Sequence, residues 1–227
     1  VRAFGGISSP WHFIDADRLA LHNTNRGLAF FPKDSGWNGG PASLKAQILA
    51  DYLPGATAED AWYHESDRVN ERYDVCLCLA NEYSVRQLVA CRNFPVVLQA
   101  TTGANWLSQM HRHILGVDDC TECRNGENKT PVFECSVVPV RVHEKESDAA
   151  LPFLSAASGL MLATALQKLQ AGQLVSMPRN DWRWDFGSPH KLASSGMRQC
   201  KQACANRYDV RLRRSVNRDS LWIDLIQ

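Results

Sequence analysis

Short apolar runs alternate with amphipathic stretches through the first half of the chain. Four runs have the length and flanking turn residues of buried strands, at residues 11–15, 61–64, 73–79 and 95–100. Helical periodicity appears at 41–53, where Pro54 ends the pattern, and again near 84–91. Strands separated by helices predict an α/β fold, Rossmann-like, with a mainly parallel sheet.

The second half has a different pattern. A polar stretch at 124–130 leads towards a long apolar segment at 149–169, which is interrupted by Ser155, Ser158 and Lys168. Such an interrupted segment predicts a buried helix rather than a membrane span. Alternation in the tail, 174–227, predicts antiparallel strands. We therefore expect two parts, a main domain at 1–172 and a C-terminal extension at 173–227.

Composition and charge exclude some classes of partner. A hydrophobic content of 44% supports a packed core, and a formal net charge of +1 gives no reason to expect nucleic acid or an anionic membrane as the main partner. The arginines at 211, 213, 214 and 218 are interpreted as a solvated strand face, with a basic docking surface as the alternative. No secretory leader pattern opens the chain, which favours a cytoplasmic location.

Two tight cysteine pairs lie far apart along the chain. Cys120 and Cys123 form the first pair, and Cys200 and Cys204 form the second. Spacing of this kind, among polar residues, is typical of a structural tetrathiolate zinc site, which would tie the C-terminal extension to the middle of the chain. The alternatives are buried thiols or two disulfides.

Other cysteines and several polar residues follow the predicted strands. Cys76 and Cys78 point to the same side of their strand and are interpreted as small buried hydrophobes. Asp15, Asn81 and Thr101 fall at strand ends, where parallel α/β sheets bind their ligands.

Taken in order, these residues resemble one family. An acid-rich strand end at Asp15, an Asn-x-x-Arg segment from Asn23 to Arg26, a lysine at Lys45 and the two cysteine pairs resemble the ThiF/MoeB/HesA proteins. These are relatives of the adenylation domains of ubiquitin-activating E1 enzymes. The resemblance runs from about residue 13 to residue 204.

The resemblance implies ATP-dependent adenylation of the C-terminal carboxylate of a ubiquitin-like or sulfur-carrier protein. Arg26 and Lys45 would then face the phosphates together with Mg²⁺, Asp15 would bind the ribose, and Asn23 would hold the loop or a phosphate. Each residue also has a structural interpretation. Asp15 is then a turn cap, Arg26 a surface ion pair, and Lys45 a solvated helix residue.

Cys135 lies after the first cysteine pair. Members of the ThiF type carry a cysteine there that takes part in sulfur or acyl transfer, so the resemblance implies that Cys135 captures the activated carbonyl. The alternative is a buried, inert thiol.

Two departures from the family pattern define a second hypothesis. The glycine-rich phosphate loop is not in this chain and is expected upstream of Val1, and Asn81 stands where the family has an aspartate that binds magnesium. The chain is therefore expected to be either an E1-like adenylyltransferase or a catalytically inactive E1-like subunit that docks a ubiquitin-like partner. The resemblance implies a homodimer or a pseudo-symmetric heterodimer in both cases. A zinc-bearing nucleic-acid module is disfavoured by the nearly neutral charge.

Overall fold

The computed structural model divides the chain into two compact units, residues 1–71 and 72–227. The structure describes residues 10–24, 27, 29–63, 65, 66, 73–80, 85, 86, 89, 90, 94–103, 106–125, 152–174, 177–187, 191–196 and 200. The predicted boundary at 172/173 lies inside the second unit. The compact units therefore divide the chain at a different place, and the boundary at 172/173 stays a prediction.

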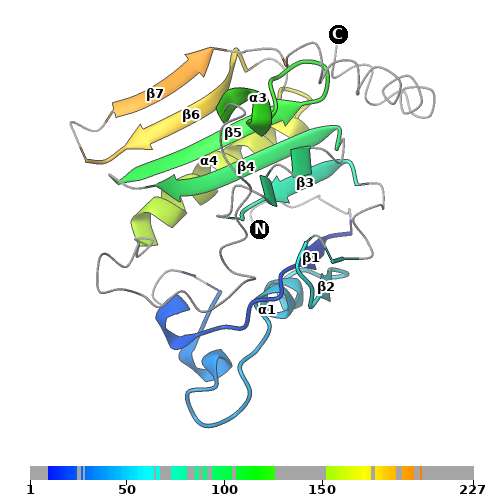
Figure 1. Cartoon of the computed structure of the whole chain (residues 1–227), viewed down its shortest axis with the longest axis vertical. Coiled ribbons are helices and arrows are strands. Elements are labelled where there is room, and N and C mark those ends of the chain that lie inside the picture. The colour runs from blue at the N-terminus through cyan, green and yellow to red at the C-terminus, as the bar shows by residue number, and fades with distance from the viewer. Residues whose placement is uncertain are drawn as a thin grey trace. The chain divides into compact units, whose positions relative to one another are not determined.

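The first unit contains a two-stranded parallel sheet with a helix beside it (Figure 1). Strand β1 (His12–Ile14) pairs with β2 (Thr57–Glu59), and α1 (Lys45–Asp51) precedes β2. Two short 3₁₀ helices, η1 (Leu21–Asn23) and η2 (Pro32–Ser35), lie in the connection from β1 to α1. The predicted strand at 11–15 and helix at 41–53 are confirmed. The strand expected at 61–64 is wrong, because β2 is formed by 57–59 and residues 61–63 are turn and bend.

Five strands form the sheet of the second unit, in the order β3-β4-β5-β6-β7. Their bounds are β3 (Val75–Cys78), β4 (Val96–Gly103), β5 (Leu107–Ile114), β6 (Arg179–Asp185) and β7 (Lys191–Gly196). The predicted strands at 73–79 and 95–100 are confirmed as β3 and β4. Of the helix expected near 84–91, the structure describes residues 85, 86, 89 and 90, and all four are helical.

The pairing in this sheet corrects the expectation of a mainly parallel sheet. Strands β3 and β4 are parallel, whereas β4, β5, β6 and β7 pair antiparallel in succession. The connection from Gly103 to Leu107 is too short to cross over the sheet, so β5 can return only antiparallel to β4. The fold is a mixed α/β fold, and the antiparallel strands expected in the C-terminal extension are confirmed for β6 and β7.

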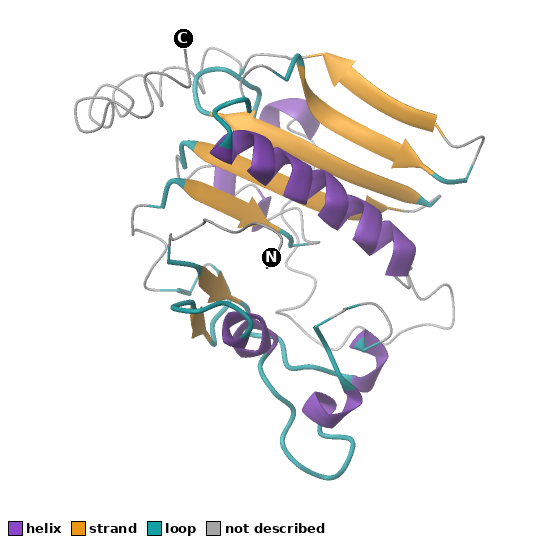
Figure 2. Cartoon of the chain, turned by 180° about the vertical axis from the view of Figure 1, so that it is seen from behind, coloured by secondary structure: helices purple, strands orange, loops and turns teal. Residues whose placement is uncertain are grey.

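Helix α4 (Pro152–Gln170) crosses one face of the sheet, as Figure 2 shows. Its buried side chains pack on β4 and β5 in a core that contains Val96, Leu98, Ala100, Met110, Ile114, Leu162, Ala165 and Leu174. Fully burying a side chain of this kind stabilises the fold by about 1.5–3 kcal/mol. The long helix predicted at 149–169 is therefore confirmed as a buried helix. No helix among the described residues has both the length and the apolarity needed to cross a bilayer.

The two cysteines of β3 behave as the sequence predicted. Cys78 is buried, and Cys76 is partly exposed. Burial raises the pKa of the Cys76 thiol far above its ordinary range, and the neighbouring Cys78 acts in the same direction. The Cys76 thiol is therefore protonated and unreactive at neutral pH.

Candidate functional site

An acidic turn follows β1 in the first unit. The Asp15 carboxylate accepts a hydrogen bond from the Asp17 backbone N–H at 2.8 Å, so Asp15 caps the turn that its sequence position allowed. The Asp17 carboxylate accepts one from Lys45 Nζ at 2.7 Å. Lys45 N also donates to the Asp17 carbonyl at 3.0 Å. The structure thus brings Asp15 and Lys45 to the same turn, with Asp17 between them.

Asn23 has a structural contact of its own. Its side-chain oxygen accepts a hydrogen bond from Ala20 N at 3.0 Å, and the residue is only 5% exposed. This contact favours the loop-holding role over a direct contact with phosphate. Arg26, the other end of the predicted motif, lies outside the described residues.

Sequence analysis missed a polar ladder across the β1 and β2 pair. His12 Nδ1 lies 2.7 Å from Thr57 Oγ1, and His12 Nε2 lies 3.2 Å from Glu59 Oε2. Ser66 Oγ donates to the same Glu59 oxygen at 2.7 Å. The register of the two strands places these side chains together. No local motif in the sequence carries that information.

An open hollow of about 500 Å³ lies between η2 and α1. It is lined by Arg18, Phe31, Lys33, Asp34, Ser43, Leu44, Gln47, Ile48, Asp51 and Tyr52. None of the predicted nucleotide-binding residues that the structure describes, Asp15, Asn23 and Lys45, lines it, so we do not assign it to the nucleotide.

Three of the four predicted metal ligands meet in the second unit. The sulfur atoms of Cys120, Cys123 and Cys200 all lie within 4.8 Å of one another. Cys120 directly precedes the short helix α3 (Thr121–Asn125), and Cys200 follows the end of β7. The Cys120 backbone N–H donates to Cys200 Sγ at 3.1 Å across 80 positions of sequence. Cys204 lies outside the described residues.

Two of these cysteines, Cys120 and Cys200, differ in pKa. A hydrogen bond from the Cys200 thiol lowers the pKa of Cys120 to about 4, although burial opposes the shift. The same contact, together with burial, raises the pKa of Cys200. Cys120 is therefore a thiolate at neutral pH, which is the form that coordinates metals. No disulfide joins the described cysteines.

The geometry of these sulfurs fits a metal ion. Tetrahedral zinc with bonds of about 2.3 Å to sulfur places its ligand atoms about 3.8 Å apart. The observed upper limit of 4.8 Å needs only a small contraction to reach that distance. Among the described residues, no other group of three His, Cys, Asp or Glu side chains brings its ligand atoms this close together. The cluster can hold a metal ion with three protein ligands.

Two further predicted residues, Asn81 and Cys135, lie outside the described residues, and their roles stay predictions. Thr101, expected at a strand end, lies within β4, where its carbonyl accepts a hydrogen bond from Ser158 Oγ of α4 at 2.9 Å. This carbonyl therefore anchors the helix to the sheet.

Solved structures share this fold. E. coli MccB in complex with MccA-N7isoASN has a TM-score of 0.61 and 13% sequence identity, over 84% of this chain and 58% of that one. The microcin C7 biosynthetic enzyme MccB with N-formylated MccA gives a TM-score of 0.62 at 14% identity, again over 84% and 58%. PaaA gives 0.53 at 13%, over 81% and 63%.

This chain therefore shares the fold of MccB and PaaA. Identities this low show the fold alone. The chain spans about 58% of the length of MccB. No protein-family model matches the sequence, and no curated protein matches it.

Proposed function

We propose that this protein is an E1-like adenylyltransferase, which uses ATP to activate the C-terminal carboxylate of a ubiquitin-like or sulfur-carrier protein. The observation that carries the proposal is the position of Lys45 beside the acidic turn after β1, in a fold shared with MccB. MccB has been crystallised with AMPCPP and MccA together, so the same fold holds a nucleotide and a polypeptide at once in that protein. Arg26 and Asn81 complete the proposed site.

The reaction explains the need for cations. A carboxylate oxygen of the carrier forms a bond to the α-phosphorus, the bond from that phosphorus to the pyrophosphate oxygen breaks, and pyrophosphate leaves. Both reactants are anionic, so Lys45 and Arg26 would lower the charge repulsion between them. Mg²⁺, when bound, would neutralise phosphate charge.

The contact between Lys45 and Asp17 suits this role. Both side chains are partly exposed, at 18% and 41%, and a pair of this kind contributes about 1 kcal/mol or less. A triphosphate therefore competes with Asp17 for the ammonium group at little cost. Asp17 would keep the lysine extended along the turn until nucleotide arrives.

We further propose a structural zinc ion held by Cys120, Cys123, Cys200 and Cys204. Four thiolates close the coordination sphere, so this ion would stabilise the fold and take no part in the chemistry. After adenylation, the Cys135 sulfur would form a bond to the activated carbonyl, the bond from that carbonyl to the phosphate oxygen would break, and AMP would leave. The assembly we propose is a homodimer or a pseudo-symmetric heterodimer.

The second candidate is an inactive E1-like subunit that docks a ubiquitin-like partner. Asn81 favours it, because an amide in place of a carboxylate removes a charge from the predicted magnesium site. At an effective dielectric constant near 20, one charge about 4 Å from a cation contributes roughly 4 kcal/mol. Such a loss would slow turnover severely.

Exchange of labelled pyrophosphate into ATP distinguishes the two candidates. We expect the full protein, with its metal content intact, to catalyse exchange only when a carrier ending in Gly-Gly is present. Lys45→Ala should slow exchange roughly 100-fold or more, because it removes a phosphate-facing cation, while Lys33→Ala should leave the rate unchanged. Carrier binding without exchange would favour the docking subunit, and the absence of both would reject the E1-like function.

A further inference from the structure

A fully buried ion pair lies beside residues 115–120, which connect β5 to α3 and are called the Cys120 loop below. Arg112 of β5 and Asp118 both have side chains that are 0% exposed. The guanidinium binds the carboxylate through two bonds, from Nε to Oδ2 at 2.8 Å and from Nη2 to Oδ1 at 3.1 Å. Asp118 Oδ2 also accepts a hydrogen bond from Ile114 N at 3.0 Å. The start of the loop is thereby fixed to the end of β5.

Arg112 also contacts the connection between α4 and β6. Nη1 donates to the Leu174 carbonyl, and Nη2 donates to the Met177 carbonyl at 3.3 Å. One guanidinium therefore joins three segments, β5, the Cys120 loop and the chain that enters β6. A planar group with five donors in a fixed arrangement suits this geometry, and a lysine ammonium does not.

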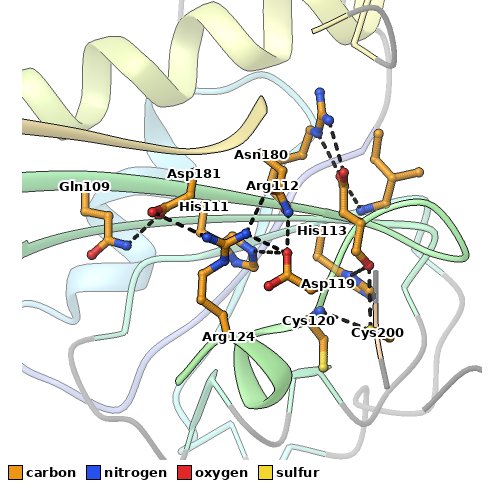
Figure 3. A network of polar contacts seen from close by, with 12 residues as sticks. Gln109, His111, Arg112, His113, Asp119, Cys120, Arg124, Asn180, Asp181 and Cys200 are labelled. Carbon is orange, nitrogen blue, oxygen red and sulfur yellow. Dashed lines mark hydrogen bonds and ion pairs between the residues drawn. The ribbon is translucent and has the colours of Figure 1, made fainter. Parts of the chain in front are cut away.

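A second set of contacts fixes the next residue of the loop. Asp119 Oδ1 accepts hydrogen bonds from Arg124 Nη2 at 2.7 Å and from Asn180 Nδ2 at 2.5 Å (Figure 3). Asn180 belongs to β6 and is 0% exposed. Consecutive aspartates thus tie the loop to two neighbouring strands immediately before Cys120.

These anchors reach the cysteine cluster through the backbone. Cys120 N donates to Cys200 Sγ, and the Asp118 carbonyl lies 3.6 Å from the same sulfur. The position of Cys200 relative to Cys120 therefore depends on the backbone that Arg112 holds. Cys123 follows within α3, whose residue Arg124 is bound to Asp119.

We propose that Arg112 is a positioning residue for the metal centre. By clamping Asp118, it holds Cys120 and Cys123 in place to bind the metal, with Cys200 beside them. The inference rests on the proposed zinc site. Buried ion pairs contribute little net stability compared with apolar residues of the same volume, so geometric positioning is the role that accounts for this one.

The test uses the full chain, reduced and metal-free, titrated with Cd²⁺ in competition with a chelator. Thiolate-to-metal charge-transfer absorption reports how many sulfurs bind. We expect Arg112→Lys, which keeps the charge, to weaken Cd²⁺ binding about 10- to 100-fold and to reduce the charge-transfer band. Arg183→Lys is the matched control, because Arg183 lies on β6, is half-exposed and pairs with Asp181. Its affinity should match the wild type.

A comparison of the two cysteine pairs gives an independent readout. Cys200→Ser with Cys204→Ser should retain a band from two thiolates, whereas Cys120→Ser with Cys123→Ser should lose tight binding altogether. Adding Arg112→Lys to the first of these variants should abolish the remaining band. A role in general stability alone would produce no such asymmetry between the two cysteine pairs.

Three results would overturn the inference. The first is an Arg112→Lys protein that binds Cd²⁺ as tightly as the wild type with the same spectrum. The second is an equal loss of Cd²⁺ affinity when either cysteine pair is replaced. The third is a wild-type chain that binds no Cd²⁺, which would reject the zinc site itself together with the inference.

If Arg112→Lys does not fold, Arg112→Met with Asp118→Asn takes its place, because it removes both charges and keeps an acceptor for Ile114 N.

Discussion

His113 is a buried residue of β5 that faces the Cys120 loop, with 3% of its surface exposed. Its Nδ1 lies 3.1 Å from the Asp118 carbonyl. Burial lowers the pKa of His113, and the nearby His111 acts in the same direction, while Cys120 and Asp118 oppose it. The imidazole is therefore neutral in the folded protein at neutral pH.

This neutral histidine makes stability depend on pH. An unfolded histidine takes up a proton below about pH 6.5, and the folded one takes it up only at lower pH, so acid favours the unfolded chain. We expect the free energy of unfolding to fall as pH decreases from about 6.5, by up to about 1.4 kcal/mol per pH unit from this residue. His113→Gln should flatten that part of the profile, measured by urea unfolding.

Above about pH 7.5 His113 is neutral in both the folded and the unfolded protein, which provides the internal control. Wild type and His113→Gln should there show equal slopes. Parallel profiles through the acidic range would contradict the prediction.

Single residues differ in how much their sequence position reveals. Spacing pointed to the cysteines, because coordination imposes a local pattern, and three of the four gather in the structure. The role of Lys45 stays a prediction from its place in an ordered motif, and its contact with Asp17 was not predicted. Arg112 and Asp118 were missed, because an arginine in a strand is usually solvated and its burial depends on contacts from distant segments.

At the scale of elements, α4 is the clearest case. Apolar residues occur all around it, yet the structure buries one face, formed by Leu154, Ala157, Ser158, Leu162 and Ala165. Leu160, two positions before Leu162, is 61% exposed. Leu160 and Leu162 are therefore the same residue type on the same helix, but one side chain is exposed and the other is buried.

This difference predicts unequal mutational effects. Leu162→Ala should lower the free energy of unfolding by about 2–5 kcal/mol, because it leaves a cavity against the sheet. Leu160→Ala should change it by about 0.5 kcal/mol or less. Urea unfolding of both variants checks this, and equal losses would show that α4 packs through a different face.

Strand β5 explains why the sheet was only partly predicted. Its sequence, from Leu107 to Ile114, contains two histidines, a glutamine, a serine and an arginine, and reads as polar. Yet β5 lies in the middle of the sheet, and Ser108, His111, Arg112 and His113 are buried. Ion pairs and hydrogen bonds compensate the burial of Ser108, Arg112 and His113, and hydrophobic patterning does not detect such compensation.

At the scale of the molecule, strand order follows from contacts that no local window contains. Strand β6 comes after α4 in sequence but pairs with β5, and β7 leads directly towards Cys200. The sequence predicted an extension after residue 172, and its first two strands instead complete the sheet of the second unit. The resemblance predicted from an ordered series of motifs agrees with the fold that this chain shares with MccB. The pairing within the sheet was not.

The turn at Gly172, which has a φ of 65°, suggests that the gene could be cut in two there. A fragment ending at residue 172 would expose the edge of β5, and the remaining fragment would carry β6, β7 and Cys200. Co-expressed with an affinity tag on one half only, the fragments should reassemble and elute together, as in protein complementation. A tagged half recovered alone would show that strand pairing and the cysteine cluster cannot replace the missing peptide bond.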